Sequence, residues 1–145
     1  MKCIFCSIVE KEREAAYVYE DKDFIAIMDK YPINIGHTLV LPKRHYSTLL
    51  DMPLNEISKL FVLTAHLAKA VVRSVNSDGF SIGQNNGEAA NQLIPHVHVH
   101  IVPRHINDMT KWASRRFVTF EQLILVAEQI KNRLVVEEIN NKPVI

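Results

Sequence analysis

The stretch His96-Val-His-Val-His-Ile-Val102 decides the fold of this chain. Strict alternation of a polar residue with a β-branched one is the pattern of a strand with one buried face. Residues two apart in a strand share a face, so three imidazoles line one side and the valines and isoleucine face the core. Same-face neighbours lie roughly 6–7 Å apart, and one small substrate group can therefore contact two imidazoles together.

Two kinds of chemistry use such a row of imidazoles. A neutral imidazole can attack phosphorus and form a phosphohistidine, and His98 is the best-placed nucleophile because it has a neighbour on each side. Alternating strand histidines also hold catalytic zinc, so a zinc site made by His96, His98 and His100 stays open. A structural cluster explains the pattern less well, since three of the seven histidines of the chain alternate strictly here.

The rest of the chain supplies the partners of this strand. Periodicity predicts an amphipathic helix over residues 53–74 and a second helix from residue 120 to about 136. Alternating or continuous apolar runs predict five strands in all, at residues 16–20, 24–28, 37–41, 80–84 and 93–102. Strands in local groups around one long helix favour an α+β domain with a five-stranded, mainly antiparallel sheet.

Composition narrows the classes of function. The 145 residues carry 17 basic and 16 acidic side chains, which leaves little surplus charge for coating a nucleic acid. With 48% hydrophobic residues, the length predicts one domain over residues 1–145. No apolar run reaches the roughly 18 residues of a membrane span, and no targeting signal precedes Glu10. We therefore expect a cytoplasmic protein with no membrane partner and no nucleic-acid partner.

The only two cysteines, Cys3 and Cys6, have the spacing with which two thiolates grip one metal ion. A redox pair and two small buried apolar side chains are the alternatives. In a cytoplasmic protein a structural disulfide is not expected.

The sequence resembles the histidine-triad (HIT) family of nucleotide hydrolases and transferases over about residues 3–104. Its signature, His-apolar-His-apolar-His and two apolar residues, is matched by residues 96–102 and followed by Pro103-Arg104. Other family blocks occur in the same order: Cys3-Ile-Phe-Cys6-Ser-Ile-Val, Tyr19-Glu20-Asp21, Met28-Asp29 and Gly36-His37-Thr-Leu-Val-Leu-Pro-Lys43-Arg-His45. Residues 105–145 match poorly and form a variable C-terminal segment with its helix.

The resemblance implies a role for each conserved type of side chain. His98 would be the nucleophile that takes up a nucleoside monophosphoryl group, and His100 would lie beside the phosphate and the leaving-group oxygen. His37 and His96 would support the array. Nucleotide contacts are expected from His98 and His100 and from three further residues, Asp29 at the ribose and Asn85 and Gln92 at the phosphate or sugar.

The resemblance also implies a structural metal and an oligomer. In many microbial members the N-terminal cysteine pair binds zinc together with two histidines, which here are His45 and His96. Such a zinc would fasten the N-terminus to the active-site strand without taking part in the chemistry. Two copies of the chain would form a homodimer with a continuous sheet.

Two features depart from the family pattern. Asn91 and Leu93 flank Gln92, where glycine and a hydroxyl residue are usual, and the leucine cannot offer a hydroxyl to the leaving group. After Arg104 the chain carries its single tryptophan, Trp112, which we expect to pack on the sheet from a surface loop. Arg115 and Arg116 could contact an acidic leaving group, but a solvated charge pair is the simpler interpretation.

The sequence thus predicts a hydrolase of purine nucleoside 5′-monophosphate derivatives that acts through a covalent nucleotidyl-histidine. Phosphoramidate, acyl-adenylate and dinucleoside polyphosphate would all present the same α-phosphate to His98. No catalytic cofactor is required. A nucleotide-binding or scaffold protein with weak catalysis and a metallohydrolase with three zinc-binding histidines are the alternatives.

Overall fold

A five-stranded antiparallel sheet with strand order β1-β2-β3-β5-β4 forms the centre of the computed structural model. The structure describes residues 2–140, with side chains up to Leu134, so residue 1 and residues 141–145 of the predicted domain lie outside the described part. The strands are β1 (Tyr17–Glu20), β2 (Phe24–Met28), β3 (Thr38–Pro42), β4 (Gly79–Gly83) and β5 (Val99–Arg104). This confirms the predicted α+β class and sheet.

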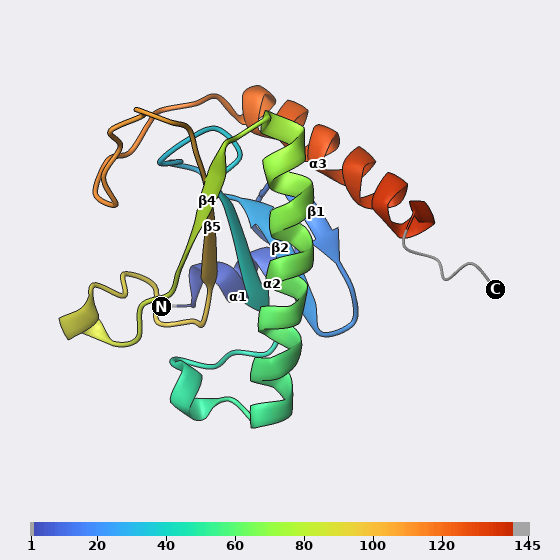
Figure 1. Cartoon of the computed structure of the whole chain (residues 1–145). Coiled ribbons are helices and arrows are strands. Elements are labelled where there is room, and N and C mark those ends of the chain that lie inside the picture. The colour runs from blue at the N-terminus through green and yellow to red at the C-terminus, as the bar shows by residue number, and fades with distance from the viewer. Residues whose placement is uncertain (1, 141–145) are drawn as a thin grey trace.

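Helices cover both faces of the sheet (Figure 1). The long helix α2 (Leu54–Val75) and the C-terminal helix α3 (Phe120–Asn140) pack on one face and on each other. Their apolar sides close the larger core, which includes Leu60, Leu67, Ile130 and the inward residues of the sheet. The predicted helix over 53–74 is shifted by one residue, because Pro53 is the N-cap and cannot donate a backbone hydrogen bond.

The opposite face is covered by a six-residue helix, α1 (Ile4–Val9), that sequence reasoning did not predict. Phe5 and Ile8, three residues apart on this helix, pack against the apolar residues of β2 and β3 that point away from α2. Six residues are too few to establish a helical period in a sequence. The only signal was the Cys3–Cys6 spacing, which brings both thiols to one side of a helical turn.

The alternation in residues 96–101 is confirmed, but the strand begins later than predicted. Val97, Val99 and Ile101 are fully buried in the larger core, and the histidines lie on the face covered by α1. Ladder pairing with β3 stops at Val99 opposite Val40. Two residues further along β3 stands Pro42, which has no N–H to offer, and Val97 instead donates its N–H to Tyr46 O.

Two short 3₁₀ turns complete the described elements, at Leu49–Asp51 and Glu88–Ala90. None of the described helices has the length and apolar character needed to cross a membrane.

Candidate active site

The histidines gather where β2, β3 and β5 meet α1. Asp29 directly follows β2 and His37 directly precedes β3, and their backbones are joined by a hydrogen bond from Asp29 N to His37 O. Gly36 makes this turn possible, since its φ of 99° is strained for other residues and a Cβ there would lie 2.9 Å from Val75 Cγ1. The register of β3 and β5 then places His100 opposite Leu39 on the same face.

His98 lies in the middle of this group. Its ring is 5.0 Å from the ring of Phe5 and 5.0 Å from that of His100, measured between centroids. His98 Nδ1 lies 2.7 Å from His96 O, and because a carbonyl oxygen only accepts, Nδ1 must carry the proton. The lone pair is therefore on Nε2. Burial lowers the pKa of His98, which keeps the ring neutral and this lone pair available.

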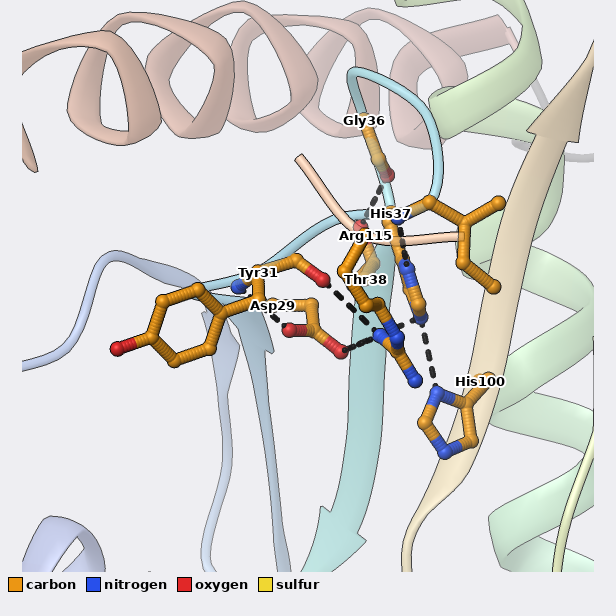
Figure 2. A network of polar contacts seen from close by, with 8 residues as sticks. Asp29, Tyr31, Gly36, His37, Thr38, His100 and Arg115 are labelled. Atoms are coloured by element: carbon orange, nitrogen blue, oxygen red, sulfur yellow. Dashed lines mark hydrogen bonds and ion pairs between the residues drawn. The ribbon is translucent and has the colours of Figure 1, made fainter. Parts of the chain in front are cut away.

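His37 and His100 form a second fixed pair (Figure 2). His37 Nδ1 accepts the N–H of Ile33 at 3.0 Å, so its proton is on Nε2, which donates to His100 Nδ1 at 2.9 Å. The remaining proton of His100 is then on Nε2. Burial lowers the pKa of His37 to about 2 and that of His100 to about 3, so both rings stay neutral at cellular pH.

Asp29 completes this part of the site with a nearly buried carboxylate. Oδ1 accepts the N–H of Tyr31 at 2.8 Å, and Oδ2 lies 3.4 Å from His37 Nε2. Oδ2 also accepts a hydrogen bond from Arg115 Nη1 at 3.1 Å, as Figure 2 shows. Burial raises the pKa of the Asp29 carboxyl, an effect that the Arg115 guanidinium partly offsets.

His96 turns away from the other two triad histidines. Its Nε2 lies 2.8 Å from Pro42 O and must donate, so its lone pair is on Nδ1. This atom is 3.5 Å from Cys3 Sγ, 3.6 Å from Cys6 Sγ and 3.2 Å from His45 Nδ1. Burial raises the pKa of the Cys6 thiol to about 11, a cost that a cation among these atoms would remove.

These four side chains fit a zinc ion. All four donor atoms lie within 4.8 Å of one another. Zn–S bonds of roughly 2.3 Å and Zn–N bonds of roughly 2.0 Å place tetrahedral ligands about 3.3–3.8 Å apart, which agrees with the separations from His96 Nδ1. The other group of three possible ligands among the described residues is Asp29, His37 and His100, so His98 belongs to neither.

The predicted phosphate loop is organised within itself. Gln92 accepts the N–H of Gly87 at 2.7 Å and donates to Ser47 O at 2.7 Å, and its amide is therefore occupied. Asn85 donates only a long contact of 3.5 Å to Asn91 O. Leu93 is 88% exposed. Nucleotide contacts by Asn85 and Gln92 stay predictions.

The C-terminal segment reaches the site, which corrects the interpretation of Arg115 and Arg116 as a solvated charge pair. Arg115 bonds Asp29, and Arg116 Nε donates to Ile33 O at 3.1 Å. Trp112 does pack on the sheet, but it does so over Gly83 and at 5.1 Å from the ring of His100. No local pattern joins residues 112–116 to Asp29, because their proximity arises only from the path of the chain.

Comparison with known proteins places this geometry in a family. The HIT domain model matches residues 10–107, which is most of the chain. The chain belongs to the HIT family. Within this family it is 38% identical to the adenylylsulfatase of Arabidopsis thaliana over 112 residues, 77% of the chain and 56% of that protein. It is 35% identical to the adenosine 5′-monophosphoramidase of Saccharomyces cerevisiae over 102 residues, 70% of the chain and 62% of that protein.

Solved HIT structures have the same fold. A histidine triad nucleotide-binding protein of Sulfolobus tokodaii superposes with a TM-score of 0.87 at 34% identity, and the match covers 94% of each chain. A zinc-bound histidine triad family protein of Mycobacterium smegmatis superposes with a TM-score of 0.88 at 32% identity, covering 97% of this chain and 99% of the other.

Proposed function

We propose that this HIT protein hydrolyses purine nucleoside 5′-monophosphate derivatives with His98 Nε2 as the nucleophile. The observation that carries the proposal is the bond from His98 Nδ1 to His96 O, which leaves the Nε2 lone pair free beside His100. Two relatives are named as an adenylylsulfatase and an adenosine 5′-monophosphoramidase, and both names describe cleavage of an adenosine 5′-phosphate derivative.

The chemistry takes two displacements at the α-phosphorus. His98 Nε2 forms a bond to phosphorus while the bond to the leaving-group atom breaks, and the electron pair departs with that atom. The His100 Nε2–H donates a hydrogen bond to the oxygens that gain charge. Water then attacks phosphorus, the N–P bond breaks with its electrons returning to Nε2, and the water proton passes to bulk solvent as the monophosphate is released.

We further propose that zinc is held by Cys3, Cys6, His45 and His96, in agreement with the fit of their donor atoms. When bound, the ion supplies a structural cross-link and stands apart from His98. His96 then positions the nucleophile from its backbone oxygen while its ring serves the metal. This division of labour favours a nucleophilic mechanism over a metallohydrolase, which needs His96, His98 and His100 to converge on one ion.

A panel of substrates tests the proposal. Derivatives of AMP with amine, acyl, sulfate and nucleotide leaving groups are offered to the zinc-loaded protein and to His98→Ala. We expect at least one to be cleaved, and we expect the variant to lose activity by a factor on the order of 10⁴ while it still binds AMP. The matched control is His105→Ala, which removes an exposed imidazole outside the site and leaves turnover unchanged.

Two outcomes contradict the proposal. If the unmutated protein cleaves no member of the panel yet binds AMP, the chain is a nucleotide-binding protein. If His98→Ala keeps most of the activity, another group is the nucleophile.

A further inference from the structure

Residues 105–117, which we term the arm, cross back over the site and are tied down at both ends. At the first end Asp108 accepts the N–H groups of His105 and Thr110. The buried amide of Asn34 donates to Asp108 Oδ2 at 3.0 Å and to Pro103 O at 2.8 Å. At the other end the Arg116 N–H donates to Pro32 O at 2.8 Å. The path of the arm is therefore built into the fold.

Two side chains between these anchors reach the site. Trp112 packs edge-on against the His100 ring. Arg115 extends to Asp29, where its Nη1 contacts Oδ2 at 3.1 Å and Tyr31 O at 3.0 Å (Figure 2). The Arg115 side chain is 34% exposed and that of Asp29 is 13% exposed. This is a half-buried ion pair at the carboxylate that the family resemblance assigns to the ribose.

Nucleotide binding would disturb this pair. Both oxygens of Asp29 already have donors, Tyr31 N on Oδ1 and Arg115 on Oδ2. Ribose hydroxyls that bind Asp29 must therefore share or displace the guanidinium. A half-buried guanidinium without an acceptor is unfavourable, so Arg115 needs another anion nearby. Its charge already acts on His98 and His100, where it is among the causes of their lowered pKa values.

We propose that Arg115 is a phosphate-binding residue that exchanges Asp29 for the phosphoryl oxygens when the ribose occupies Asp29. This inference rests on the proposed nucleotide site at His98 and deepens it. The exchange makes binding depend on the 5′-phosphate, because a nucleoside displaces Arg115 from Asp29 and offers it no anion in return. It also supplies a donor for the phosphate that Leu93, without a hydroxyl, cannot provide.

The test compares the binding of adenosine and AMP by titration calorimetry at pH 8, with zinc-loaded protein. In Arg115→Gln we expect AMP to bind about 10- to 100-fold more weakly, the loss of one charge-assisted contact. Adenosine binds equally well or more tightly, since Asp29 is released. Arg115→Lys keeps the charge but loses the planar fork, and it retains part of the preference for AMP. The control Lys111→Gln removes an exposed charge from the same arm and changes neither affinity.

Opposite results separate this inference from the proposed function. Equal losses for adenosine and AMP in Arg115→Gln would mean that Arg115 only holds the arm, and an unmutated protein that binds AMP no better than adenosine overturns the inference outright. Neither result bears on turnover by His98. Conversely, an unmutated protein that prefers AMP but cleaves nothing refutes the hydrolase and leaves the role of Arg115 intact.

Discussion

Backbone groups decide which nitrogen of three histidines carries the proton. The Ile33 N–H sets His37, Pro42 O sets His96 and His96 O sets His98. Each ring consequently has one nitrogen committed to the fold and one free for another task. Three residues of one type, two positions apart, thus acquire different roles without any change in their own chemistry.

The protonation state of His37 has a consequence for stability. Its pKa is lowered to about 2 in the folded protein because the ring is buried, whereas the unfolded chain has a pKa near 6.5. Below about pH 6.5 the unfolded state therefore binds a proton that the folded state refuses, and stability falls with pH. The contribution is complete above pH 6.5, and its slope approaches about 1.4 kcal/mol per pH unit below it.

We expect urea unfolding between pH 7 and 5 to reveal this slope. By pH 5 the unmutated protein should lose about 2 kcal/mol more of its unfolding free energy than His37→Gln does. Comparing slopes cancels the constant cost of the substitution and the acid loss of any bound metal. The exposed His105→Gln should follow the unmutated protein. Parallel curves for the unmutated protein and His37→Gln would contradict the account.

At the scale of elements, hydrophobic period was enough to predict five strands and two helices. It failed where interactions outside the element decide the outcome. Nothing within residues 93–98 shows that they are excluded from the ladder, because the cause lies in Pro42 on β3. Likewise, α1 is a helix because Phe5 and Ile8 find a sheet face to cover, and such tertiary support cannot be read from six residues.

The zinc cluster is the second attachment of α1, in addition to its apolar contacts. Cys6→Ser should abolish zinc binding and lower the unfolding free energy by about 3 kcal/mol when free zinc exceeds its dissociation constant some 100-fold. Faster hydrogen exchange is expected in α1 and around His96, whereas β2 and β3 keep their protection. Zinc content and hydrogen exchange are the measurements.

The control for this prediction also separates two mechanisms. His98→Ala should retain the full zinc content, because His98 is not in the group formed by Cys3, Cys6, His45 and His96. A loss of zinc in that variant would revive the metallohydrolase with three zinc-binding histidines.

At the scale of the whole molecule, the family blocks predicted which residues gather but not what covers them. The strand order brings His37, His98 and His100 together, and the blocks upstream of the triad already ordered them correctly. The arm follows the last block and carries no periodicity. Its position depends on the Asn34 amide and on Pro32 O, some 70 to 80 residues earlier in the chain. Contacts of this kind arise only from tertiary structure.

The two edges of the sheet differ in a way that favours one of them for a homodimer. On β1, Glu20 pairs with Lys11 and Lys43, and an irregularity interrupts the pairing with β2, features that protect an edge. On β4 the outer edge is unpaired within the described chain, and Phe80 and Ile82 remain 49% and 42% exposed. Two copies joined through β4 would continue the sheet and cover these side chains.

Substitution at this edge tests the predicted dimer. We expect the unmutated protein to sediment as a dimer at micromolar concentration and Ile82→Lys to sediment as a monomer, because two buried lysines would face each other across the two-fold axis. Leu125→Lys places the same charge on an equally accessible position of α3 and should remain dimeric. A monomeric unmutated protein, or an Ile82→Lys variant that stays dimeric, would show that β4 is not the interface. Because β4 also carries Gly83 beneath Trp112, a dimer through this strand would brace the floor of the site in both copies.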